Sequence, residues 1–337
     1  MYTYAAWGPQ PTEHFPNAGP RPQEATVASE NQKLMWATAA TGFFKANPAQ
    51  IYNRPELAGL LESHRSEWQA PPSLTFKRFL GTMESQGSLK RLEIRRLPSK
   101  GRIRRMGIPY DPRYVNPAFG MLTRYVSREP SIYGVALSLR PDAYLSHATA
   151  LHLHGLTTQS LGPVYVNKEQ TPKPSRANLD QGAMSAAFKR APRVSQNTYS
   201  YEGVEIVLLS GKHTNRLQVG EIADGTGGTV PATQMERTLI DVAVRPVYAG
   251  GASRVLEAFR AAKGRLSVTT LLEALQGIRH VYPYHQAIGF YMERAGYTSD
   301  DCEQLRALGL NFDFYLEHGM VSPEYDVSWR LHYPEGF

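Results

Sequence analysis

Cys302 is the sequence's single cysteine, which excludes an internal disulfide and a zinc site built from several cysteines. This usage fits a reducing compartment, so we expect a cytoplasmic protein. No apolar run approaches the roughly 18 uninterrupted residues of a membrane-spanning helix. Residues 1–29 lack the basic and apolar regions of a secretory signal and carry five prolines. They are predicted to form a flexible, proline-rich leader.

Patterns that would indicate catalysis or metal binding are also scarce. Three of the ten histidines lie between residues 147 and 154, but their spacings of five and two point to different faces of a helix, whereas helical zinc pairs lie at i and i+4. The segment Leu208–Thr214 ends like a phosphate-binding loop, yet Ile206 replaces the required glycine and His213 the required Ser or Thr. Cys302 has no evident histidine partner in the sequence. We therefore predict no catalytic residue, no metal and no cofactor, and expect a protein that is not an enzyme.

Positive charge is present, and it is concentrated in one segment. The chain has a net charge of +7. Residues 77–128 hold thirteen Lys and Arg against three acidic residues, a net charge of +10, so the rest of the chain is net −3. A regional surplus of this kind is typical of a surface that contacts the nucleic-acid backbone. The alternative is a solvated basic face without a partner.

Two helices are predicted ahead of the basic segment. The first covers residues 31–45 and ends before Asn47-Pro48. Its apolar positions are Leu34, Met35, Thr38, Phe43 and Phe44. The second runs from Arg54 to about Glu67, with Asn53 as the N-cap and Glu56 three residues later, as in a capping box.

A third helix is predicted after Pro71-Pro72, with Ser73 as the N-cap and an end near Gln86. Its apolar residues form one stripe: Phe76, Phe79, Leu80 and Met83. The short connection to the second helix is what a helix-turn-helix requires.

A basic hairpin follows the third helix. Leu92 and Ile94 alternate with charged residues, which predicts a strand. The turn-forming residues 98–101 follow, and residues 102–105 are predicted to form the return strand. Three helices followed by a hairpin indicate a winged helix, in which the third helix enters the major groove and the wing lies along the backbone or minor groove. We assign residues 30–128 to this DNA-binding domain.

The candidate DNA contacts are polar and basic residues on the outward face of the third helix and in the wing. They are Thr75, Lys77, Arg78, Thr82, Arg95, Arg96, Lys100, Arg102, Arg104 and Arg105.

Residues 129–337 are predicted to form a larger domain of mixed helices and strands. Strands are expected at 164–166 and 204–209, and helices at 146–154, 234–244, 252–262, 268–276, 285–295 and 299–308. Arg237 and Asp241 are four residues apart and are expected to form an intrahelical ion pair. The predicted fold class is α+β, with an N-terminal winged helix-turn-helix followed by a mixed α/β domain.

Three blocks of this larger domain resemble the AbiEi-type antitoxins of type IV toxin-antitoxin systems. They are Tyr144–Leu156 (YLSHATALHLHGL), Glu236–Ala243 (ERTLIDVA, followed by Pro246 and Gly250-Gly251) and Ile288–Glu293 (IGFYME). The resemblance spans about residues 143–293 and lies behind a winged-helix module, which is the family's domain order.

The resemblance implies a bifunctional regulator of phage abortive infection. Its winged helix would repress its own operon by binding inverted repeats in double-stranded promoter DNA. Its C-terminal antitoxin domain would counteract a cognate nucleotidyltransferase-type toxin, without requiring a stable complex.

Two other functions stay open on the sequence. The first is a stand-alone winged-helix transcriptional regulator whose larger domain senses a ligand or mediates assembly. The second is a metal-dependent nuclease or DNA-modifying enzyme.

Overall fold

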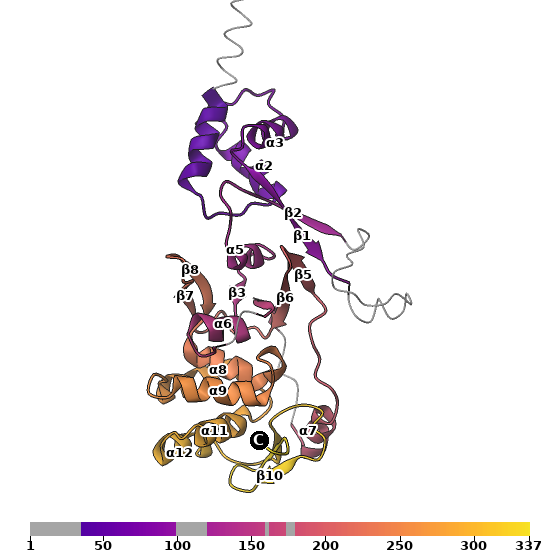
Figure 1. Ribbon diagram of the computed structural model, residues 1–337, viewed down its shortest axis with the longest axis vertical. Coiled ribbons are helices and arrows are strands. Elements are labelled where there is room, and N and C mark those ends of the chain that lie inside the picture. The colour runs from indigo at the N-terminus through magenta and orange to yellow at the C-terminus, as the bar shows by residue number, and fades with distance from the viewer. Residues whose placement is uncertain (1–34, 99–119, 159–161, 173–178) are drawn as a thin grey trace, which may run out of the picture. The chain divides into compact units, whose positions relative to one another are not determined.

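The computed structural model describes residues 35–98, 120–158, 162–172 and 179–337 (Figure 1). They form two compact units. The smaller unit contains the described residues up to Leu89 except 49–54, and the larger unit contains 49–54 and the described residues from Lys90 onward. No helix among these residues is long and apolar enough to cross a membrane.

The smaller unit is helical and is built around aromatic side chains. Its helices are residues 35–46, α2 (Arg54–Ser63) and α3 (Phe76–Ser85). The ring of Trp68 stacks on Phe79 with centroids 6.0 Å apart and on His64 at 5.0 Å. Trp36 and Phe44 also pack against Phe79. Burial of these large rings gives a short three-helix unit a substantial apolar core.

All three helices exist where the sequence predicted helices, but the details differ. In the first helix the buried residues are Trp36, Ala37, Ala40 and Phe44, whereas Met35 is 53% exposed, so the predicted apolar face was wrong at its N-terminal end. Residues 31–34 of that prediction lie outside the described part of the chain.

The second helix ends at Ser63 and not near Glu67. The chain continues in turns to Gln69, which has a φ of +54°, and the Arg65 guanidinium donates to the carbonyl oxygen of Pro71 at 2.8 Å. The third helix is capped by Thr75 and not by Ser73, because the Thr75 hydroxyl accepts a hydrogen bond from the Arg78 N–H at 3.3 Å.

The basic strand β1 (Lys90–Arg96) pairs with β2 (Met121–Val126) in an antiparallel register that joins Lys90 to Val126 and Arg95 to Met121. The predicted pairing with residues 102–105 was therefore wrong, since the strand that pairs with β1 begins about twenty residues later. The turn formers at 98–101 favour a nearer return strand than the one that pairs with β1. Residues 99–119 lie outside the described part of the chain.

β1 and β2 belong to an eight-stranded mixed sheet with the order β2-β1-β5-β6-β4-β3-β8-β7. The β4–β6 and β3–β8 pairs are parallel and the others are antiparallel. The remaining strands of this sheet are β3 (Tyr144–Leu145), β4 (Val164–Glu169), β5 (Thr198–Tyr201), β6 (Val204–Gly211), β7 (Val219–Ala223) and β8 (Thr229–Thr233). A second, three-stranded sheet contains β9 (Phe314–Tyr315), β10 (Glu324–Asp326) and β11 (Leu331–Tyr333).

The helices of the larger unit pack on the sheet and on one another. They are α5 (Ile132–Leu137), α6 (His147–Leu153), α7 (Gln181–Phe188), α8 (Met235–Val244), the 3-10 helix Pro246–Tyr248, α9 (Ala252–Ala262), α10 (Val268–Ile278), α11 (Tyr284–Arg294) and α12 (Ser299–Arg306). Figure 1 shows α8, α9, α11 and α12 stacked in layers on one side of the strands. One apolar core lies among these helices and a second lies between α5 and the sheet.

The mixed α+β class that the sequence predicted is therefore confirmed. The expected strands at 164–166 and 204–209 correspond to β4 and β6, and the expected helices correspond to α6 and α8 to α12. The Gly-rich segment 224–229 is the turn of the β7–β8 hairpin, where the Asp224 side chain accepts hydrogen bonds from the N–H groups of Thr226 and Gly228.

Candidate nucleic-acid interface and a buried polar network

One side of α3 is apolar and the other is basic. Phe79, Leu80 and Met83 are buried, whereas Lys77 and Arg78 are exposed. The ion pairs found among the described residues include neither Lys77 nor Arg78. These two cations therefore project outward from α3.

The two predicted threonine contacts on α3 are engaged with the helix itself. Thr75 is the N-cap, and the Thr82 hydroxyl donates to the carbonyl oxygen of Arg78 at 2.9 Å. Thr75 stabilises the start of the helix, and the Thr82 hydroxyl is already bonded within it. Contact with a partner would therefore fall mainly on Lys77 and Arg78.

Side chains on β1 alternate between the two faces of the sheet. Leu92 and Ile94 are buried in the core beneath the sheet, and the intervening residues Arg91, Glu93 and Arg95 are exposed. Arg91 was not among the predicted contacts, although it lies on the same face as Arg95. The period-2 alternation that predicted the strand would have identified it.

Arg95 and Arg96 are adjacent and therefore belong to opposite faces of the sheet. Arg95 is paired in register with Ser200, and Arg96 with Tyr199. The Arg96 guanidinium donates to the side-chain oxygen of Asn197 at 3.5 Å, which holds it beside the chain that enters β5. The other predicted contacts, Lys100, Arg102, Arg104 and Arg105, lie outside the described residues.

Not all of the positive charge in residues 77–128 is available to a partner. Arg124 is 9% exposed, and its guanidinium donates twice to the carbonyl oxygen of Ser138, at 2.8 and 3.1 Å. Lys90 pairs with Glu129 at 2.6 Å, and that hydrogen bond raises the pKa of Lys90 and lowers the pKa of Glu129. Arg124 supports the fold and Lys90 is already paired with a surface carboxylate, so the interface is smaller than the net charge indicates.

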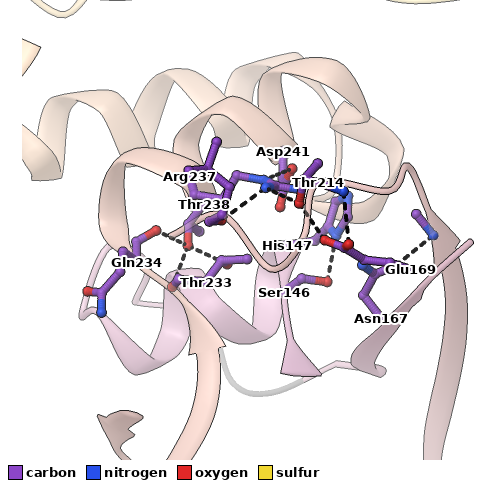
Figure 2. Close-up of polar contacts among 12 residues, drawn as sticks. Ser146, His147, Asn167, Glu169, Thr214, Thr233, Gln234, Arg237, Thr238 and Asp241 are labelled. Atoms are coloured by element: carbon purple, nitrogen blue, oxygen red, sulfur yellow. Dashed lines mark hydrogen bonds and ion pairs between the residues drawn. The ribbon is translucent and has the colours of Figure 1, made fainter. Parts of the chain in front are cut away.

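A polar network connects α8 with the ends of the central strands (Figure 2). Arg237 is almost fully buried, and its Nε lies 2.8 Å from the Asp241 carboxylate, which confirms the predicted ion pair. A second nitrogen of Arg237 donates to the Thr214 hydroxyl at 3.2 Å and to the carbonyl oxygen of Leu217 at 3.1 Å. The guanidinium thus fixes the loop after β6 to α8.

Glu169, at the end of β4, organises the same loop. Its carboxylate accepts hydrogen bonds from the N–H groups of Thr214 and Arg216, at 2.8 and 3.3 Å, from the Thr214 hydroxyl, and from the Tyr144 hydroxyl at 3.1 Å. Burial alone would raise the pKa of Glu169, but the hydrogen bonds from Thr214 and Arg216 outweigh it and hold the pKa below its ordinary value. The segment that ends like a phosphate-binding loop therefore closes around a carboxylate of the chain itself.

The three histidines near α6 lie in different surroundings. His147 is buried with a φ of +52°, and its Nδ1 lies 2.9 Å from the hydroxyl oxygen of Ser146. Burial lowers the pKa of His147 to about 4, so the ring is neutral at pH 7. His152 is exposed, and the Nε2 of His154 is hydrogen-bonded to the carbonyl oxygen of Thr233 at 2.8 Å. Among the described residues, no group of three His, Cys, Asp or Glu side chains is placed to hold a metal ion.

The sequence blocks that resemble the antitoxins occupy structural positions. The first block contributes β3 and α6, the second contributes α8, and α6 packs directly against α8. In the third block, a Cβ on Gly289 would lie 2.1 Å from the Trp329 ring, and the Trp329 indole N–H donates to Glu293 at 2.7 Å. All three blocks therefore build the core of the larger unit.

Comparison with protein-family models finds no match, and comparison with curated proteins finds none. Among solved structures, the chain is similar to the crystal structure of the RV2827C protein from Mycobacterium tuberculosis. The two share 13% sequence identity with a TM-score of 0.49, over 88% of this chain and 91% of that chain. That identity is too low to transfer a function from one protein to the other.

Proposed function

We propose that the chain is a DNA-binding regulator whose recognition helix is α3. The observation that carries the proposal is the division of α3 into a buried apolar side and an outward side with the exposed cations Lys77 and Arg78. A helix anchored by its apolar stripe presents its opposite side to the major groove. Exposed arginines on β1, a strand with which a wing would begin, would add contacts to the DNA backbone.

We further propose that this regulator is the antitoxin and autorepressor of a type IV toxin-antitoxin operon. Support comes from the resemblance of three sequence blocks, two of which form the adjacent helices α6 and α8. In this proposal the smaller unit, through α3, binds inverted repeats at the promoter, and the larger unit counteracts a nucleotidyltransferase-type toxin.

The DNA-binding proposal is tested by titrating the full chain with duplex DNA from upstream of its own gene and with a scrambled duplex, at two salt concentrations. Fluorescence anisotropy should show tighter binding to the upstream duplex and weaker binding to both at higher salt. Equal affinity for the two duplexes would contradict sequence recognition.

The antitoxin proposal has a separate test. Co-expression of the chain with the toxin encoded beside it should restore growth, and the K77A/R78A variant should also restore growth because α3 serves DNA binding. Failure of the wild-type chain to protect would contradict the antitoxin role and leave the DNA-binding role standing.

A further inference from the structure

The larger unit has a second basic segment, outside residues 77–128. The connection from α7 to β5 carries Lys189, Arg190 and Arg193, all exposed, and residues 181–201 contain no acidic residue. Figure 1 shows this connection running from α7, beside the helical layers, to β5 in the sheet. Lys189 and Arg190 lie at the C-terminal end of α7, where cations are favourable to the helix dipole, so they have a local explanation. Arg193 has no such explanation.

The connection is fixed where it approaches the sheet. The Ser195 N–H donates to the Tyr248 hydroxyl at 2.8 Å, and the Ser195 hydroxyl donates to the carbonyl oxygen of Leu208 at 2.6 Å. Two residues later, the Asn197 side chain accepts the hydrogen bond from Arg96. Arg193 therefore lies on an anchored segment.

Arg96 and Arg193 belong to neighbouring parts of the larger unit, because Arg96 is hydrogen-bonded to Asn197. Arg193 and Asn197 are four positions apart in the sequence, so their Cα atoms are at most about 14 Å apart. One strand of duplex DNA carries a phosphate about every 3.4 Å along its axis, so this span covers about four phosphates. Neither arginine has an ion pair with a described acidic side chain.

We propose that Arg96 and Arg193 form a second contact to the backbone of duplex DNA, carried by the larger unit. This inference rests on the proposed DNA-binding function. Guanidinium groups keep their charge and match phosphate geometry with paired N–H donors, which favours a regular polyanion as the occupant. Arg95 belongs to the other face of the sheet, so the proposed contact does not include it.

The test compares R193Q with K263Q in the full chain. Lys263, just after α9, is also exposed, so both variants lose one surface charge of the larger unit. The probe is a 30-base-pair duplex of random sequence, titrated over a series of salt concentrations, with single-stranded RNA of 30 nucleotides as a second probe. The magnitude of the log-log salt slope on duplex DNA should fall by about 0.9 in R193Q and by about 1.8 in R96Q/R193Q, and should not change in K263Q.

The outcomes separate this inference from the proposed function. An unchanged slope in R193Q, or an equal fall in K263Q, overturns the Arg96–Arg193 contact while DNA binding by the wild-type chain stands. If R193Q weakens binding to RNA but leaves binding to duplex DNA unchanged, the proposal that duplex DNA is the ligand is wrong. A wild-type chain that binds no duplex overturns the proposed function, and this inference with it.

Discussion

The guanidinium of Arg237 lies 2.8 Å from the carboxylate of Asp241, one turn further along α8, and both side chains are largely buried. The same guanidinium holds the loop after β6 through Thr214 and the carbonyl oxygen of Leu217. A buried charge that loses its partner is strongly destabilising, because the remaining charge cannot regain water. This pair is therefore a structural centre of the larger unit.

Removing one member of the pair should destabilise the larger unit. We expect Arg237→Ala to lower the free energy of unfolding by about 3–5 kcal/mol, measured by urea denaturation followed by circular dichroism. The control is Arg254→Ala, which breaks the exposed pair with Glu257 and should change stability by at most about 1 kcal/mol. Similar losses in the two variants would show that Arg237 is no more important than a surface charge.

Acid should destabilise the fold through His147. Its pKa is about 4 in the folded chain and near 6.5 when the ring is exposed, so between these values the unfolded chain binds a proton that the folded chain excludes. Stability should therefore fall as the pH falls from 6.5 to 4, by up to about 3 kcal/mol from this residue. Urea denaturation at pH 7, 6 and 5 should show a shallower decline in His147→Gln. The exposed His152→Gln should behave as wild type, and a decline unaffected by His147→Gln would assign the acid sensitivity elsewhere.

Substitution of two arginines of the basic segment should affect different properties: DNA binding for Arg95 and stability for Arg124. Arg95→Ala should reduce the salt slope of DNA binding by about 0.9 and leave stability nearly unchanged, because the side chain is exposed. Arg124→Ala should lower the free energy of unfolding by about 1–3 kcal/mol, because the carbonyl oxygen of Ser138 loses both hydrogen bonds from the buried Arg124 guanidinium. Anisotropy titrations of both variants measure DNA binding, and denaturant unfolding of both variants measures stability. A smaller salt slope without a loss of stability in Arg124→Ala would contradict its structural role.

A methyl group should be tolerated on α3 and rejected on α11. A Cβ on Gly289 would meet the Trp329 ring at 2.1 Å, so Gly289→Ala should destabilise the larger unit by about 1–3 kcal/mol through overpacking. A Cβ on Gly81, within α3, would meet no described atom within 4 Å, and Gly81→Ala should stabilise the helix by about 0.5–1 kcal/mol. Thermal unfolding distinguishes them, and destabilisation by Gly81→Ala would indicate contacts on the outward side of α3.

The long elements could be predicted from the sequence because their apolar spacing is strong. The helices α8 to α12 and the strands β4 and β6 follow such patterns, and the Arg237–Asp241 pair follows from the helical repeat. The two-residue strand β3 has no detectable period, and the partner of β1 is set by a sheet that joins residues more than a hundred positions apart, such as Arg96 and Tyr199. Local turn signals favour the nearest return strand, which is why the sequence points to residues 102–105 and not to β2 as the partner of β1.

The site residues show the same limit. Helical spacing placed Lys77 and Arg78 opposite the buried stripe of α3, and the structure agrees. The burial of Arg124 and the anchoring of the segment beside Arg193 depend on contacts with Ser138, Tyr248 and Leu208, which are distant in sequence. From composition alone these cations are indistinguishable. Contacts between residues distant in sequence determine which of them support the fold.

The most direct test of DNA recognition by α3 is the ratio of the affinity for upstream promoter DNA to the affinity for a scrambled duplex, in the wild-type chain and in K77A/R78A. We predict that the wild-type chain prefers its promoter by at least tenfold and that the variant loses most of this preference while it retains its circular dichroism spectrum and weaker, salt-dependent binding to random duplex. An unchanged ratio in a folded variant would contradict the assignment of α3 as the recognition helix.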